Sequence, residues 1–133
     1  MSLTNIPAGV ATGDAVSEIF KFAKEHHFAL PAVNVIGSST ANTVMETARD
    51  LKAPVIIQYS NGGAQFNAGK ALSNENQRSA IAGAITGAIH IHELANLYGA
   101  TVILHTDHAA KKLLPWIDGL LDASEKHVKS HGH

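Results

Sequence analysis

Three short polar groups in this 133-residue chain contain residue types that do chemistry. Residues 105–108 (HTDH) place a carboxylate between imidazoles, residues 60–63 (SNGG) join a hydroxyl to two glycines, and Asn34 stands alone. A histidine–aspartate group can move protons or bind a metal, and successive glycines free backbone N–H groups to approach an anion. The chain has no cysteine, so histidine, aspartate and glutamate remain for such chemistry.

The group at residues 105–108 is the strongest of the three signals. It follows an apolar run, and burying two imidazoles and a carboxylate there is costly unless they meet a metal, a ligand or each other. On a regular strand the side chains of His105 and Asp107 point one way and that of His108 the other. A catalytic zinc usually takes three protein ligands, and no HExxH pattern supplies them here.

The other polar groups also have purely structural interpretations. Asn34 is a common turn residue, and residues 60–63 are equally consistent with a flexible turn and with an anion site. Neither group has the spacing of a Walker loop or a GxGxxG fingerprint, so nucleotide binding is not supported. Histidines 127, 131 and 133 are expected to be exposed near the C-terminus, or to bind metal adventitiously.

Apolar patterns predict the elements that position these groups. Three short runs are typical of strands buried on both faces: residues 28–35, 54–60 and 100–104. Helical periodicity predicts four helices: residues 12–26, 38–52, 80–99 and 113–129. We expect residues 1–11 to form an irregular leader and residues 61–75 to form a long loop with at most one short helix.

The predicted order is one leading helix and then three strand–helix units. This alternation favours an α/β fold with a parallel sheet, either an open doubly wound sheet or the first part of a (β/α)₈ barrel. Both architectures place functional groups at the carboxyl ends of the strands. Asn34, residues 60–63 and residues 105–108 each follow a predicted strand, so we expect them to meet at one edge of the sheet.

The overall composition narrows the class of partner. Ten Lys and Arg against eleven Asp and Glu leave a net charge of −1, which gives no basic field for nucleic acid. No apolar run reaches the roughly 18 residues of a membrane span, and the start of the chain lacks a secretion signal. We expect a cytoplasmic protein of one domain, without nucleic-acid or membrane partners.

Residues 105–127 (HTDHAAKKLLPWIDGLLDASEKH) resemble the signature region of class II, zinc-dependent fructose-1,6-bisphosphate aldolases of the longer-looped subgroup. Three earlier segments resemble the same family in the same order: residues 12–16 (TGDAV), 29–35 (ALPAVNV) and 52–70 (KAPVIIQYSNGGAQFNAGK). The resemblance covers nearly the whole chain. It implies an α/β fold of the TIM (β/α)₈ barrel family, with a leading helix and about the first three βα units in this chain.

The resemblance also implies roles for individual residues. Asp107 would be the acid/base that exchanges a proton with the C4 hydroxyl of the substrate, and His108 would be a ligand of the catalytic Zn²⁺. Ser60 would help to hold the phosphorylated substrate, and Asn34 would lie in the rim of the active site. Ala109 stands where many relatives carry cysteine, which removes a thiol near the metal but no metal ligand.

The implied function is that of a homodimeric glycolytic and gluconeogenic lyase. Such an enzyme reversibly cleaves fructose 1,6-bisphosphate into dihydroxyacetone phosphate and glyceraldehyde 3-phosphate. A barrel typically needs about 250 residues. We therefore expect residues 1–133 to be the N-terminal part of a single barrel domain, without activity alone and with the remaining zinc ligands elsewhere. The alternatives are a free-standing α/β small-molecule or metal-binding module without catalysis, and a histidine-rich metal-binding protein.

Overall fold

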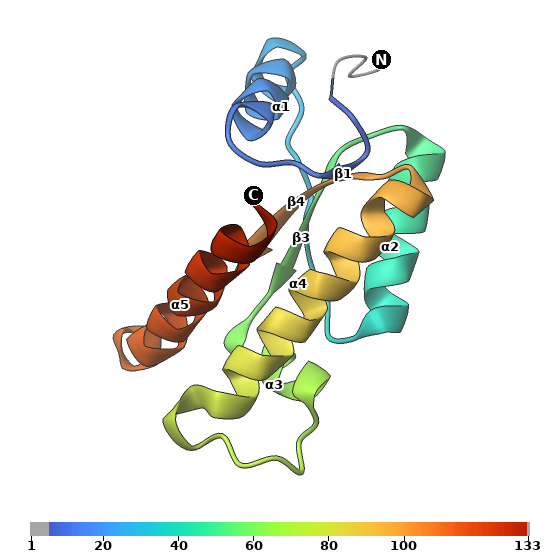
Figure 1. Ribbon diagram of the computed structural model, residues 1–133. Helices are drawn as coiled ribbons and strands as arrows, with labels where there is room; N and C mark the ends of the chain where they lie inside the picture. Colours follow the sequence, from blue (N-terminus) through green and yellow to red (C-terminus); the bar gives the residue numbers. More distant parts are fainter. Residues whose placement is uncertain (1–5, 133) are drawn as a thin grey trace.

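Four parallel strands form one sheet in the computed structural model, which describes residues 6–132. Their spatial order is β1-β4-β3-β2. The strands are β1 (Gly9–Val10), β2 (Ala32–Asn34), β3 (Val55–Tyr59) and β4 (Thr101–Thr106). Figure 1 shows that helices connect consecutive strands, which confirms the expected α/β fold.

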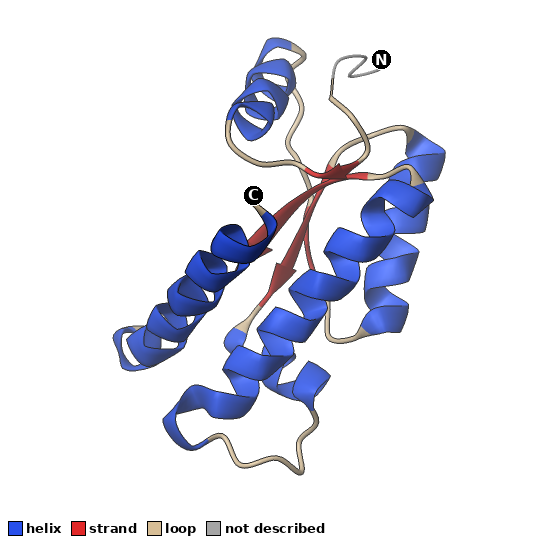
Figure 2. Ribbon diagram, viewed as in Figure 1, coloured by secondary structure: helices blue, strands red, loops and turns tan. Residues whose placement is uncertain are grey.

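Helices of very different length link and flank these strands. The α-helices are α1 (Asp14–Glu25), α2 (Ser38–Leu51), α3 (Asn61–Ala68), α4 (Arg78–Tyr98) and α5 (Leu114–His131). Short 3₁₀ turns at Glu75–Gln77 and Lys111–Leu113 lead into α4 and α5. Figure 2 shows α1 beside the amino ends of the strands and α3 at the carboxyl end of β3. None of the helices within residues 6–132 is long and apolar enough to span a membrane.

The predicted irregular leader at residues 1–11 is wrong in its last part. Gly9 and Val10 pair in parallel register with Thr101 and Val102, and so form the edge strand β1. Two residues are too few to show any periodicity, so the pattern gave no signal for this strand. Residues 1–5 of the expected leader lie outside the described residues.

The predicted loop at residues 61–75 contains one short helix, as expected: α3 begins directly after β3 and takes up the first half of the segment. Ser60 caps this helix, because its Oγ accepts a hydrogen bond from the backbone N–H of Gly63 at 3.0 Å. The sequence did not show where this helix begins and ends, because the asparagines and glycines of the segment are poor helix formers.

One face of the sheet packs on the helices. Val55, Ile57 and Tyr59 alternate along β3, and all three belong to the buried core shared with α2 and α4. Helix α5 joins this core through Trp116, which is fully buried and donates its indole N–H to the carbonyl of Ala80 at 3.3 Å. Side chains of the alternate positions therefore lie on the opposite face of the sheet.

The tightest helix contact is the one between α3 and α4. A Cβ atom at Gly83 would lie 1.8 Å from the backbone oxygen of Ala64, so only glycine fits there. The amide of Asn67 on α3 donates to the carbonyl of Gly83 at 2.8 Å, which fixes the contact. This packing holds α3 at the carboxyl end of β3.

Replacing Gly83 with alanine tests this contact. We expect Gly83→Ala to lower the free energy of unfolding by about 1 to 3 kcal/mol, because backbone of two helices must move apart. Urea unfolding measures the effect. The matched control is Gly62→Ala on α3, whose added Cβ meets no atom within 4 Å. Equal stability of the two variants would contradict the close approach of α3 and α4.

Candidate active site

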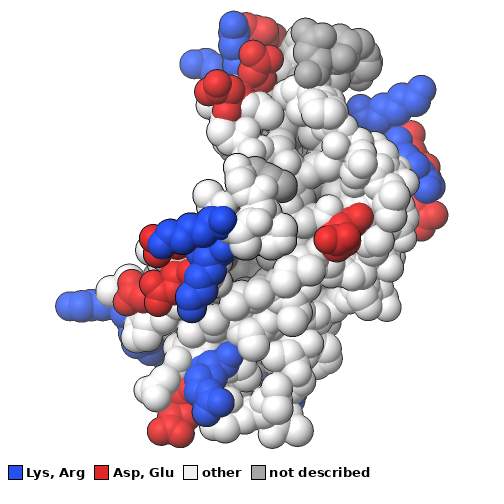
Figure 3. All heavy atoms as spheres, in the orientation of Figure 1, with Lys and Arg blue, Asp and Glu red and all other residues white. Residues whose placement is uncertain are grey.

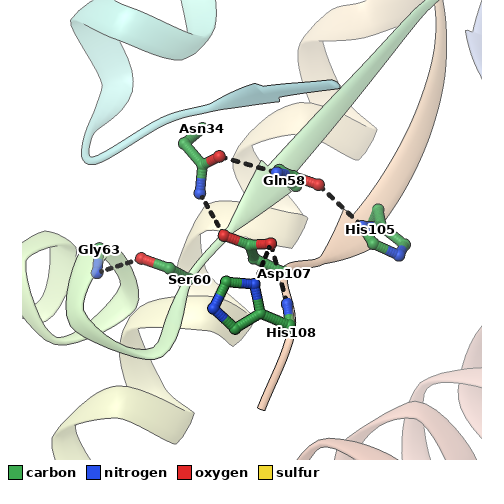
Figure 4. Close-up of polar contacts among 7 residues, drawn as sticks. All are labelled: Asn34, Gln58, Ser60, Gly63, His105, Asp107 and His108. Carbon is green, nitrogen blue, oxygen red and sulfur yellow. Dashed lines mark hydrogen bonds and ion pairs between the residues drawn. The ribbon is translucent and has the colours of Figure 1, made fainter. Parts of the chain in front are cut away.

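Asn34, Gln58 and His105 form a hydrogen-bonded row across three strands (Figure 4). Asn34 is the register partner of Gln58, and Gln58 is the register partner of His105, so the three side chains share one face of the sheet. The Gln58 Nε2 donates to Asn34 Oδ1 at 2.7 Å. The Gln58 Oε1 lies 2.9 Å from His105 Nδ1.

Asp107 joins this row just beyond the end of β4. Its backbone N–H donates to the carbonyl of Tyr59 at 2.9 Å, which extends the ladder between β3 and β4 by one step. Its Oδ2 accepts a hydrogen bond from Asn34 Nδ2 at 3.1 Å, although the two residues are 73 positions apart. The structure thus brings Asn34 and Asp107 together at the carboxyl edge of the sheet, as the sequence predicts.

The surroundings of Asp107 favour its ionised form. The backbone N–H of His108 donates to Asp107 Oδ1 at 2.9 Å, and this bond is the main cause of a pKa below the usual value of the carboxyl group. The hydrogen bond from Asn34 lowers the pKa further. At neutral pH Asp107 is a carboxylate held at both oxygens, with a quarter of its side chain exposed. It can accept a proton from a ligand above the edge of the sheet.

His108 follows Asp107 where the strand has already ended. Its ring turns back so that Nδ1 lies 3.2 Å from Asp107 Oδ1, and 94% of its side chain is exposed. A carboxylate beside one ring nitrogen is the usual partner of a metal-binding histidine. Within residues 6–132 no group of three or more His, Cys, Asp or Glu side chains could hold a metal ion, so His108 can supply one ligand but not a site.

Ser60 lies at the neighbouring strand end, at the start of α3 (Figure 4). Its Oγ accepts the N–H of Gly63, so its hydroxyl hydrogen is free to point toward a ligand. A Cβ at Gly63 would lie 3.2 Å from both Ser60 Oγ and the carbonyl oxygen of Val35, which makes glycine the best fit there. The SNGG group is therefore a helix start packed against the end of β2, rather than a flexible turn.

Two features were missed in the sequence. Gln58 is only 8% exposed, and its signal was a single amide inside an otherwise apolar run. The rings of His127 and His131 on α5 are stacked with centroids 4.2 Å apart, and the tilted ring of His92 on α4 lies 5.5 Å from that of His127. His127 is thus half-buried against α4, whereas His131 is exposed as expected, and His133 lies outside the described residues.

A cavity of about 520 Å³ lies between α4, α5 and β4, and His105 is the one member of the hydrogen-bonded row that lines it. Its walls are largely apolar, with Ile89, Leu104 and Leu121 among them. Figure 3 shows a broad, mostly uncharged surface over α4, with charged side chains of both signs gathered over α5 and at the edges of the view. A largely apolar cavity does not suit a charged substrate, so the polar strand ends remain the candidate active site.

Consecutive parallel strand–helix units with polar side chains at their carboxyl ends occur in (β/α)₈ barrel enzymes and in open doubly wound sheets, and the comparison with known proteins decides between them. The family profile described as "Fructose-bisphosphate aldolase class-II" matches residues 14–132. The chain therefore belongs to the class II fructose-bisphosphate aldolase family.

Individual relatives agree with this assignment. The chain is 59% identical over 128 residues to fructose-bisphosphate aldolase class 2 of Escherichia coli, covering 96% of this chain and 36% of the relative. It is 52% identical over 127 residues to fructose-bisphosphate aldolase of Schizosaccharomyces pombe, with the same coverage. The crystal structure of the Campylobacter jejuni aldolase superposes with a TM-score of 0.93 at 51% identity, covering all of this chain and 38% of that one. The chain thus spans little more than a third of the length of these relatives.

The hydrogen bond from Asn34 makes a testable contribution to the pKa of Asp107. We expect Asn34→Ala to raise this pKa toward its ordinary value of about 3.9 without reaching it, because the N–H of His108 still donates. A ¹³C NMR titration of the carboxyl group measures the change. The lowered pKa of Asp107 stabilises the fold above its unfolded pKa, and this stabilisation is lost as the pH falls through the folded pKa.

Asn42→Ala is the matched control for this titration. Asn42 Oδ1 is bonded to His90 Nε2 at 2.7 Å, between α2 and α4, and does not contact Asp107. An unchanged pKa of Asp107 in Asn34→Ala would show that the contact between them does not act on the carboxylate in solution.

Proposed function

We propose that residues 1–133 form the N-terminal part of a single barrel domain and that the complete enzyme reversibly cleaves fructose 1,6-bisphosphate. The products would be dihydroxyacetone phosphate and glyceraldehyde 3-phosphate. The contact between Asn34 and Asp107 carries this proposal, because it places an oriented carboxylate at the carboxyl edge of the sheet, beside an exposed histidine. The family membership of the chain supplies the substrate class.

Asp107 would act as the general base in cleavage. Its low pKa keeps it ionised, so it can take the proton of the C4 hydroxyl while the C3–C4 bond breaks. C4 then becomes the aldehyde carbon, and the electron pair of the broken bond passes to the half that carries the ketone. In the condensation direction Asp107 returns the same proton to the oxygen on C4.

His108 would hold one side of a catalytic zinc ion. Its exposed ring, with Nδ1 beside the Asp107 carboxylate, fits a metal ligand, and the further ligands would come from parts of the enzyme other than residues 6–132. When bound, the metal would act as a Lewis acid on the ketone oxygen of the substrate. Ser60 would donate its hydroxyl to a phosphate group, since its Oγ already accepts from Gly63.

The remaining features of the proposal rest on the family alone. They are a homodimeric state, a place in glycolysis and gluconeogenesis, and a location in the cytoplasm. A sugar phosphate is the small-molecule partner that the proposed reaction requires.

A hybrid enzyme tests the role of Asp107 directly. It carries residues 1–133 in place of the matching segment of the Escherichia coli relative, so that the rest of the barrel is present. We expect it to cleave fructose 1,6-bisphosphate, and Asp107→Ala to lower kcat about 10²- to 10⁴-fold because the general base is lost. A coupled assay for glyceraldehyde 3-phosphate measures this. The control Asp118→Ala changes an exposed carboxylate on α5 and should leave kcat unchanged.

Two results would argue against this role. Cleavage retained in Asp107→Ala, with zinc still bound, would remove Asp107 from the proton transfer. A hybrid enzyme that folds and binds zinc but is inactive without any further change would contradict the proposed activity of these residues.

Metal content separates the aldolase from the alternative of a histidine-rich metal-binding protein. We expect His108→Ala in the hybrid enzyme to lose bound zinc after dialysis, because one ligand of the proposed site is removed. His127→Ala and His131→Ala are the matched controls, since both rings lie in the stack on α5 away from the candidate site. Elemental analysis of the dialysed proteins decides between the two. Zinc that survives His108→Ala but follows the α5 histidines would favour the alternative.

A further inference from the structure

We propose that Gln58, in the middle of β3, is a positioning residue that orients Asp107 through the side chain of Asn34. This inference rests on the proposed function, because it assigns Gln58 a role in the same site. It adds a residue whose side chain is linked to the proposed base by two successive hydrogen bonds, with Asn34 between them.

The direction of every hydrogen bond in the row follows from the carboxylate at its end. An ionised carboxylate only accepts, so Asn34 must turn its Nδ2 toward Asp107, and its Oδ1 then faces Gln58. That oxygen also only accepts, so Gln58 must present its Nε2 to it, which leaves Oε1 facing His105. His105 must therefore carry a proton on Nδ1. One arrangement of donors and acceptors satisfies all three contacts.

Gln58 is the member of the row that is best placed to impose this arrangement. Its side chain is buried on a strand that is paired on both sides, whereas Asn34 and His105 are exposed. Its backbone carbonyl also accepts the N–H of Val35 at 3.0 Å, which ties the end of β2 to β3. Without the Gln58 donor, the exposed amide of Asn34 could rotate and present its oxygen to the carboxylate, which would repel it.

These hydrogen bonds fix the plane of the Asp107 carboxylate, and this orientation matters for the reaction. Asn34 holds Oδ2 and the backbone N–H of His108 holds Oδ1, so rotation of the group is restricted at both oxygens. A proton transfer depends on such alignment of the base with the hydroxyl. Loss of the Gln58 donor should therefore lower kcat, with little effect on KM.

A double-mutant cycle in the hybrid enzyme tests whether Gln58 acts on Asp107 through Asn34. We expect Gln58→Met to lower kcat about 10- to 100-fold, as is typical for residues that orient a functional group. Because Gln58 acts through Asn34, the double variant with Asn34→Ala should be no slower than Asn34→Ala alone. Ile57→Val is the matched control, since it loosens the buried face of the same strand; it should lower the melting temperature but not kcat.

Gln58→Glu separates the two functions of the amide while keeping its size. The carboxylate can still accept from His105 but cannot donate to Asn34, so we expect kcat to fall as in Gln58→Met. It also decides the question if Gln58→Met does not fold. Additive losses in the cycle, or full kcat in Gln58→Glu, would overturn the role of Gln58. If Asp107→Ala still lowers kcat in the same hybrid enzyme, the proposed function survives that result.

Discussion

The parallel register of β2, β3 and β4 is the constraint on which the candidate site depends. It places Asn34, Gln58 and His105 in one line across the sheet and on one face. A shift of one residue in any of the three strands would turn that strand's polar side chain toward the helices and break the row. The register is itself set by burial, because Ile57 and Tyr59 on the alternate positions of β3 belong to the helix-packed core.

The packing of helices on one face of the sheet explains why the polar side chains on the other face keep their geometry. A Cβ at Gly87 would lie 2.4 Å from the ring of Tyr59, so α4 rests directly on the central strand. The carbonyl of the same Tyr59 accepts the backbone N–H of Asp107. The packing of α4 on one face of β3 thereby helps to fix the position of Asp107, the proposed base. Rigid support of this kind is what a site built on strand ends requires.

The sequence was sufficient for the parts of the fold that repeat a pattern. The runs around Val55–Tyr59 and Thr101–Thr106 predicted buried strands, and the polar residues at the ends of all three predicted strands predicted the edge where Asn34 and Asp107 meet. It was insufficient where pairing is long-range or a cap overrides propensity. Strand β1 exists only because β4 offers it a partner, and α3 forms from poor helix formers because Ser60 caps it and α4 covers it.

Gln58 shows a different limit of sequence reasoning. A single amide inside an apolar strand forms no periodic pattern that could be recognised in the sequence. Its role depends on which residues of the neighbouring strands the register places beside it. Once the register is known, the row extends from His105 through Gln58 and Asn34 to Asp107, which directly follows β4. A metal site, in contrast, is not assembled within residues 6–132. The orientation of the base and the binding of the metal are therefore separate tasks in this fold: the first is local to three consecutive βα units, and the second depends on the rest of the barrel.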